Sequence, residues 1–392
     1  MQRLVNICSI SVSFVFLKLR LIPMKNFLTF LLLWFLGTGS VAQAVNIAVI
    51  APKSQDMARF GHDLVKGVRT AVALINQNGG ILGEEINLIE IEDRCMDNAE
   101  ISTAKLISTA SSDKEKLSLV IGPYCSNAFE KVADLYANGK VIRVIPMPLT
   151  TEQENYSAKG LFKIGGNAEA EAVAFYSFYK NKFADKNLAM FYDQDLPQTV
   201  EVAEMVQKLF VKDGHENQIQ MFEIGNMKDN YGEFAKKVVQ KNQVVYLLGS
   251  THEIAKAAQN LQEENEEIIL FTDEYLATGY FFKEMGNFVE GVYLLSLQDL
   301  KAHPEFTEDL VQLRLSGNEP KGLGVYGYAA VNLWKEMVDR AESFDFDKVC
   351  SKGEKETYKL PWGNVQFLHG VASKSSGYQI YQVKNGEYTQ VD

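Results

Sequence analysis

Strand-like and helix-like segments alternate along most of this chain, and they do so in two separate series. In the first series, short apolar runs such as 46–51 and 86–91 alternate with amphipathic stretches such as 61–77. A second series of the same kind runs from 187 to 272. A strand that is joined through a helix to the next strand is the unit of a parallel sheet. The two series therefore predict an α/β fold with two doubly wound parallel sheets.

The predicted elements follow the apolar spacing and the turn residues between them. The first series has strands at 46–51, 86–91, 117–122 and 141–146 and helices at 61–77, 99–111 and 127–138. The second has strands at 187–192, 219–223, 243–249 and 268–272 and helices at 197–213, 231–241 and 253–262. The rest of the chain is predicted to form a strand at 291–297, helices at 304–315 and 325–341, and a β-rich tail at 363–368 and 378–383.

The length agrees with two lobes. The chain has 392 residues, and even without its first 44 it exceeds the roughly 250–300 residues at which a single core stops growing.

The N-terminal segment has the pattern of a secretory signal. Lys25 precedes the apolar run Phe27–Leu36, small residues follow at 37–40, and Ala42 and Ala44 have the spacing of a cleavage site. We therefore predict that residues 1–44 are a signal peptide with an N-terminal extension, that the mature protein begins at Val45, and that it is periplasmic.

Two other features of this segment bear on that prediction. The stretch 1–23 resembles an upstream extension before the more natural start at Met24. The alternative that Leu4–Leu17 is a membrane anchor is weaker, because this run is shorter than the ~20 residues that a transmembrane helix needs. No later run of the chain is long and apolar enough to span a membrane.

The net charge argues against nucleic acid as a partner. The formal charge of the whole chain is −11, and it becomes more negative when the basic signal is removed. Such a surface repels phosphates, and the sequence shows no Lys/Arg-rich run that would offset it.

The cysteines predict one disulfide bond. Cys95 and Cys125 each follow a predicted strand, at 86–91 and 117–122, and we expect both at the carboxyl ends of neighbouring parallel strands. A bond between them agrees with an oxidising compartment. Cys350 is then left over, and we expect it to be a buried small apolar residue, with a free reactive thiol as the alternative.

Common enzyme motifs are absent from the sequence. It contains no Gly-x-Ser-x-Gly, no Gly-x4-Gly-Lys-Ser/Thr and no His-Glu-x-x-His, and its five histidines show no metal-ligand spacing. We therefore predict no enzymatic activity, no catalytic residues, no metal site and no cofactor.

Three motifs resemble those of the branched-chain amino-acid binding family, the leucine/isoleucine/valine-type periplasmic receptors of ABC transporters. The similarity extends over nearly all of 45–392. It rests on the motifs Gly67-x3-Ala71-x3-Ile75-Asn76-x2-Gly79-Gly80-Ile81-x-Gly83, Glu92-Asp93-Arg94-Cys95 with Ile121-Gly122-Pro123-Tyr124-Cys125-Ser126, and Trp362-Gly363-Asn364-Val365-Gln366-Phe367. The first motif is fairly specific for the fold and much less so for the ligand.

The resemblance implies a type I periplasmic binding protein with a ligand cleft between two lobes and three chain crossings. The first lobe would comprise 45–166 and 296–375, and the second 167–295 and 376–392. Such a receptor captures a small solute by closing its lobes and delivers it to an inner-membrane ABC permease. We expect a monomer. The same fold also serves ligand-sensing regulators, which remain the alternative, and a periplasmic enzyme on this fold ranks third.

The resemblance also implies residues that hold an amino acid. Ser126 matches a serine that binds the ligand carboxylate, although it could simply cap the helix predicted at 127–138. Glu274 matches the acid that binds the ammonium group, with Asp273 as a possible substitute and a solvated loop acid as the alternative. Phe60 stands where the family has an aromatic wall, and it could equally be a core residue.

The chain departs from the family at four further ligand positions. The threonine that contacts the carboxylate is displaced by one or two residues, to Thr150 or Thr151, and Met147 follows Pro146 in place of a small residue. Leu196 and Ser250 stand where tyrosines are common. These changes alter the volume and polarity of the pocket and therefore weaken the expectation that leucine is the ligand.

Overall fold

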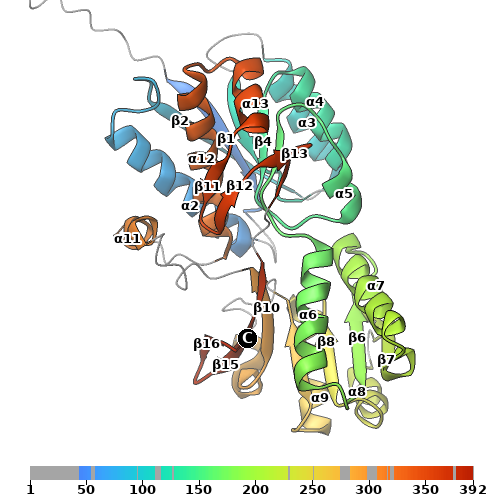
Figure 1. Cartoon of the computed structure of the whole chain (residues 1–392). Coiled ribbons are helices and arrows are strands. Elements are labelled where there is room, and N and C mark those ends of the chain that lie inside the picture. Colours follow the sequence, from blue (N-terminus) through green and yellow to red (C-terminus); the bar gives the residue numbers. More distant parts are fainter. Residues whose placement is uncertain are drawn as a thin grey trace, which may run out of the picture. The chain divides into compact units, whose positions relative to one another are not determined.

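The computed structural model describes residues 44–53, 58–94, 96–110, 116–125, 128–227, 230–249, 251–273, 283–297, 307–315, 317, 322–373 and 377–391. The described residues form two sheets of seven strands each and a two-stranded hairpin (Figure 1). We call the first sheet with its helices the first lobe, and the second sheet with its helices the second lobe. The signal-peptide prediction for 1–44 lies almost entirely outside the described residues.

The first sheet has the strand order β13-β14-β5-β4-β3-β1-β2. Strands β1 to β5 and β14 pair in parallel, and only β13 runs antiparallel to its neighbour. The strands are β1 (Val45–Ala51), β2 (Ile86–Glu92), β3 (Leu117–Ile121), β4 (Ile142–Ile145), β5 (Leu161–Lys163), β13 (Phe367–Leu368) and β14 (Val371–Ala372).

Helices cover both faces of this sheet, and the central strand β1 shows why. All seven residues of β1 are buried, as expected for a parallel strand between two helical layers. Ile47 and Val49 join one core cluster, which includes α2 (Ala58–Gln77) and α12 (Gly322–Ala341). Ala48 and Ile50 join another on the opposite face, with α3 (Asp97–Ser108) and α4 (Phe129–Asn138).

A glycine lets α2 and α12 approach closely. A Cβ atom added at Gly67 would lie 1.8 Å from the carbonyl oxygen of Gly324, so no side chain fits at this point of α2. The crossing of the two helices therefore gives a physical reason for the first glycine of the Gly67-x3-Ala71 motif.

The second sheet has the order β16-β15-β10-β9-β8-β6-β7, with β15 antiparallel to both β10 and β16. Both sheets are thus mixed, with mostly parallel strands, and the predicted doubly wound α/β class is confirmed. The strands are β6 (Leu188–Tyr192), β7 (Ile219–Glu223), β8 (Val244–Leu247), β9 (Ile269–Thr272), β10 (Tyr293–Leu297), β15 (Tyr378–Lys384) and β16 (Glu387–Gln390).

This sheet is covered in the same way. Residues of α6 (Ala168–Lys182) and α7 (Pro197–Lys212) belong to the core cluster that contains Met190 and Tyr246. Residues of α8 (Tyr231–Val239) and α9 (Thr251–Glu264) pack with Phe191 and Leu247, which point to the opposite face. Alternation along β6 and β8 thus supplies both layers.

Several elements were not predicted from the sequence. The longest is α6, whose apolar residues lie around much of the helix rather than along one stripe. The helix predicted at 127–138 begins later, at Phe129, and Ala128 rather than Ser126 holds its N-cap position. The other additions are α5 (Thr151–Asn155), β5, α13 (Phe346–Lys355), β11 (Tyr358–Leu360), β14, β16 and the short helices η1 (Glu216–Gln218), η2 (Ile224–Met227) and η4 (Gly286–Val289). The predicted β-rich segment 363–368 contains β12 (Gly363–Val365) and β13, and α11 spans Thr307–Leu315.

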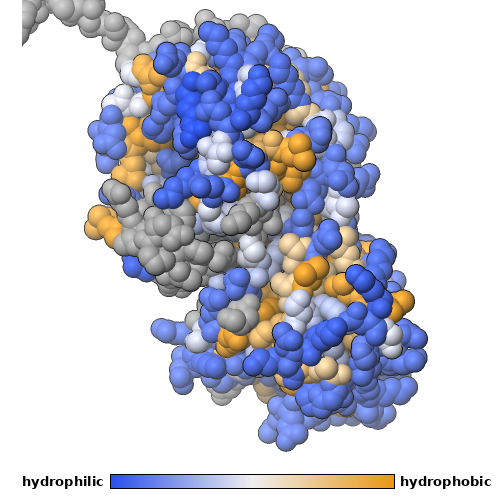
Figure 2. Space-filling model, viewed as in Figure 1, coloured by the Kyte–Doolittle hydropathy of each residue, from blue (hydrophilic) through white to orange (hydrophobic). Residues whose placement is uncertain are grey.

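The visible surface is mostly hydrophilic, with hydrophobic residues in small separate patches (Figure 2). The most exposed large apolar side chains are Leu106, Leu315 and Leu368. Within the described residues, no helix combines the length and the apolar character that a membrane span requires.

Candidate ligand-binding site

The predicted ligand residues of the first lobe follow the carboxyl ends of its strands. The strand order of the first sheet reverses between β3 and β1, because β2 and β3 lie on either side of β1. Open α/β sheets bind ligands outside the carboxyl ends at such a switch point. We therefore expect a ligand site at the segments that follow β1, β3 and β4.

Phe60, on the first turn of α2, packs against the segment after β3. Its ring stacks on that of Tyr124, with 6.2 Å between the ring centroids and 19° between the planes. Tyr124 is buried, whereas Phe60 is half-buried and also contacts the core. Phe60 can therefore serve the core and still present part of its ring as a wall.

Hydrogen bonds tie the turn after β3 to the end of β1 and to the turn after β2. The Cys125 N–H donates to Asp93 Oδ2 at 2.8 Å, the Asp93 N–H donates to the Ala51 carbonyl at 2.9 Å, and the Tyr124 N–H donates to the Ile50 carbonyl at 3.1 Å. Strands β2 and β3 are not direct neighbours, contrary to the prediction, because β1 lies between them. Cys95 lies outside the described residues, and its bond to Cys125 stays a prediction.

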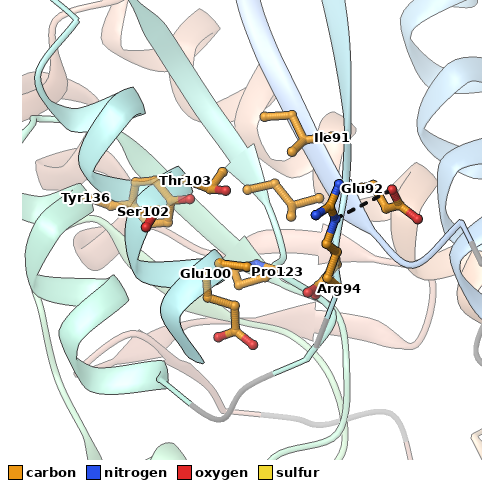
Figure 3. A pocket seen from close by; sticks show the side chains of 11 residues that line it. Ile91, Glu92, Arg94, Glu100, Ser102, Thr103, Pro123 and Tyr136 are labelled. Carbon is orange, nitrogen blue, oxygen red and sulfur yellow. Dashed lines mark ion pairs between the residues drawn. The ribbon is translucent and has the colours of Figure 1, made fainter. Parts of the chain in front are cut away.

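A cavity of about 390 Å³ lies beside these turns, between α3 and the ends of β1 and β2. Figure 3 shows Glu92, Arg94, Glu100 and Tyr136 among its lining side chains, and the dashed line marks the ion pair between Arg94 and Glu92 at 3.9 Å. Of the predicted ligand residues that the structure describes, none lines this cavity.

A buried arginine supports the same turn. Arg143 of β4 is 1 % exposed, and its Nε donates to the Gly122 carbonyl at 2.8 Å. Its guanidinium lies over the Phe129 ring, 4.7 Å from the centroid. Burial lowers the pKa of Arg143 to about 10, and the nearby carboxylates of Glu100 and Asp93 act in the opposite direction. No sequence motif indicated a role for this residue, which lies within an apolar run.

The residues after β4 have structural partners. Met147 is buried. Thr150 caps α5: its Oγ1 accepts from the Gln153 N–H at 3.3 Å, and Gln153 Oε1 accepts from the Thr150 N–H at 3.2 Å. The Thr151 N–H donates to both carboxylate oxygens of Glu201, at 2.9 Å each. Glu201 belongs to the second lobe, and sequence reasoning missed it.

On the second lobe, two of the predicted positions are described. Leu196 is the N-cap residue of α7, makes no capping bond with its side chain and is partly exposed. Asp273, after β9, is 3 % exposed. Ser126, Ser250 and Glu274 lie outside the described residues, so their places in the site stay predictions.

A buried carboxyl group lies beneath this region of the second lobe. Glu171, in the first turn of α6, is 4 % exposed, and its Oε1 accepts from the Tyr246 hydroxyl at 2.7 Å. Burial raises the pKa of Glu171 to about 7, while hydrogen bonds from Tyr246 and Tyr378 oppose that rise. No motif marked Glu171, because the sequence does not distinguish it from Glu169 in the same turn.

Cys350 is a free thiol and is fully buried, as predicted. Burial raises the pKa of this thiol to about 12, which keeps it protonated and unreactive. Among the residues that the structure describes, no group of three or more His, Cys, Asp and Glu could hold a metal ion.

Comparison with known proteins identifies the family. Residues 44–387 match the model of a family described as periplasmic binding protein. The chain belongs to this periplasmic binding protein family. The resemblance seen in the sequence motifs is thereby confirmed.

Relatives of this periplasmic binding protein carry amino-acid names. It is 24 % identical over 362 residues to an amino acid binding protein of Pseudomonas aeruginosa, covering 91 % of this chain and 94 % of the relative. It is 20 % identical over 354 residues to the leucine-, isoleucine-, valine-, threonine-, and alanine-binding protein of the same organism, covering 89 % and 92 %.

Solved structures share the fold of this periplasmic binding protein. The leucine binding protein LivK from Thermotoga maritima superposes with a TM-score of 0.76 at 20 % identity, covering 89 % of this chain and 98 % of the other. A solute binding protein from R. palustris in complex with 4-hydroxybenzoate gives a TM-score of 0.74 at 15 % identity, covering 89 % and 96 %. At these identities the likeness shows the fold alone.

Proposed function

We propose that the protein is the periplasmic substrate-binding receptor of an ABC importer, which captures an amino acid or a similar small polar solute between its lobes and passes it to a membrane permease. The observation that carries this proposal is the match to the periplasmic binding protein family over residues 44–387. The two mixed seven-stranded sheets support it, because each supplies a row of strand carboxyl ends at which a ligand can bind.

An amino acid is the ligand class that the relatives favour. Their names include amino acid binding protein and leucine-, isoleucine-, valine-, threonine-, and alanine-binding protein. We propose that Ser126 binds the carboxylate and Glu274 the ammonium group, with Phe60 as a wall. The neighbour that binds 4-hydroxybenzoate shares the same fold, so an aromatic carboxylate is the ligand to test against.

We also propose that the protein is exported by cleavage after Ala44 and that Cys95 and Cys125 form a disulfide bond. The fold supports the cleavage site, because β1 begins at Val45 with a buried residue while Ala44 is exposed. The bond between the Cys125 N–H and Asp93 supports the disulfide, because it brings the turn after β3 to within two residues of Cys95. N-terminal sequencing of periplasmic protein tests the first proposal, and non-reducing peptide mapping tests the second.

Calorimetry with L-leucine, L-threonine and 4-hydroxybenzoate tests the ligand class, together with native mass spectrometry of any solute retained through purification. Hydrogen bonds to charged groups contribute ~1.5–3 kcal/mol each, so Ser126→Ala or Glu274→Gln should weaken amino-acid binding by roughly ten- to a hundredfold. Glu274→Gln should weaken the binding of 4-hydroxybenzoate much less, since that ligand has no ammonium group. Unchanged amino-acid affinity in both variants would show that Ser126 and Glu274 do not hold the amino acid.

A further inference from the structure

A hydrogen bond joins the two lobes through groups that take no part in the strand pairing of either sheet. The Thr151 N–H at the start of α5 donates to both carboxylate oxygens of Glu201, at 2.9 Å each. Glu201 lies on α7, which packs on the second sheet, whereas α5 follows β4 of the first sheet. The acceptor is a carboxylate, so the bond is of the stronger, charge-assisted kind.

The segment around α5 is also bonded to the first chain crossing between the lobes. The Leu149 N–H donates to the Gly166 carbonyl at 3.0 Å, and the Ala168 N–H donates to the Leu149 carbonyl at 3.2 Å. Asn167 Nδ2 donates to both carboxylate oxygens of Glu154, at 2.8 and 2.9 Å. The start and the end of α5 are therefore tied to the crossing.

A buried lysine fixes α5 to the first lobe. Lys163 of β5 is 3 % exposed, and its Nζ donates to the carbonyls of Glu154 at 2.6 Å and Tyr156 at 2.5 Å. These carbonyls lie at the C-terminal end of α5, where no further helical N–H can reach them. Because α5 is held in this way, a rotation of the second lobe relative to the first changes the distance between the Thr151 N–H and the Glu201 carboxylate.

We propose that Glu201 is a positioning residue that sets the angle between the lobes by binding the Thr151 N–H next to the chain crossing. A bond that exists in only one arrangement of two lobes stabilises that arrangement, and a ligand that prefers another arrangement must overcome it. Because the Thr151 N–H is bonded to Glu201, it is not available to bind a ligand carboxylate. This role of Glu201 rests on the proposed function only in that lobe movement is the step that captures the ligand.

The chain offers substitutions that delete each half of this bond. Thr151→Pro removes the N–H alone, because proline is accepted at the first position of a helix and the preceding Thr150 has the extended conformation that proline favours, with φ −71° and ψ 161°. Thr151→Ala is its control, since it keeps the N–H. Glu201→Ala removes the acceptor. Its control is Glu204→Ala, which removes an exposed carboxylate of the same helix that forms an ion pair with Lys208 at 3.7 Å.

The distance between the lobes is the direct measurement. Spin labels at Lys131→Cys on α4 and Lys237→Cys on α8 occupy exposed positions of the two lobes, and buried Cys350 does not compete for label. Pulsed dipolar spectroscopy without ligand should show the same shift or broadening in Thr151→Pro, in Glu201→Ala and in the double variant. The controls should match the parent protein. Unchanged distributions in both single variants, or shifts that add in the double variant, would overturn the proposal.

Binding of L-leucine supplies a second, separable readout. If the lobes are coupled through this bond, both single variants should change the leucine affinity by the same factor, and the double variant should change it no further. If leucine binds none of the proteins, leucine is not the ligand, while the distance measurement still decides the role of Glu201.

Discussion

The buried carboxyl group of Glu171 should make the stability of the second lobe depend on pH. The side chain is 4 % exposed and is bonded to the Tyr246 hydroxyl at 2.7 Å. Burial raises its pKa from the ordinary 4.5 to about 7. The folded protein therefore holds this proton more tightly than the unfolded chain does. The contribution of Glu171 to the free energy of unfolding is greatest below pH 4.5, falls as the pH rises towards 7 and is constant above that value.

The size of this effect follows from the two pKa values. Each pH unit between them contributes 1.36 kcal/mol, so the interval from 4.5 to 7 corresponds to about 3 kcal/mol. Glu171→Gln keeps the shape and the oxygen that accepts from Tyr246, and it carries no titrating proton. The difference in unfolding free energy between the variant and the parent protein should therefore change by about 3 kcal/mol in favour of the variant between pH 4.5 and pH 8.

Urea unfolding followed by far-ultraviolet circular dichroism, which reports the helices of both lobes, measures this difference at half-unit steps from pH 4.5 to 8. Glu169→Gln is the matched control, because Glu169 lies on the same turn of α6 but is exposed, and its curve should run parallel to that of the parent protein. If the Glu171→Gln curve also runs parallel, even with a constant loss of stability, Glu171 does not titrate in this range and the reasoning from burial is refuted.

Three further predictions concern packing and the cysteines. Gly67→Ala should lower the free energy of unfolding by ~1–3 kcal/mol or more, because its Cβ would lie 1.8 Å from the Gly324 carbonyl oxygen; equal stability to Gly232→Ala, where the nearest atom is 3.5 Å away, would contradict this. Cys125→Ser should cost ~3–4 kcal/mol in the same urea assay and free one thiol, if the predicted disulfide exists. Cys350 should react with a thiol reagent at pH 8 only after unfolding, because burial raises its pKa to about 12; fast labelling of the native protein would disprove its burial.

The fold was largely predictable because two features of the sequence indicate its strands, namely apolar runs and the turn residues that border them. Runs such as 47–51 are apolar throughout, since both faces of a central parallel strand are buried, and turn residues separate them from amphipathic helices. The missed helix α6 lacks that contrast. Its buried face includes the charged Glu171, while the apolar Val173 on another face is exposed, so the apolar stripe on which the prediction depends does not stand out.

The candidate site was less predictable, because several of its groups act through contacts that are distant in sequence. Thr151 was expected to face a ligand, but its N–H binds Glu201 from another helix. Thr150 caps α5, a five-residue helix that the pattern did not indicate. Arg143 and Glu171 are charged residues within apolar segments, and only the fold reveals the Gly122 carbonyl and the Tyr246 hydroxyl that they bind.

The order of strands in the two sheets has a consequence for the newly made chain. The first sheet is completed by β14 and β13, and the second by β15 and β16, all of which follow residue 366. Helix α12, which covers the apolar face of α2, follows residue 321. Neither sheet can therefore be completed while the C-terminal fifth of the chain is still being synthesised. Until then, strand edges and the face of α2 stay open to other chains, a state that favours aggregation. Keeping the nascent chain apart from its neighbours thus matters until the final strands are available.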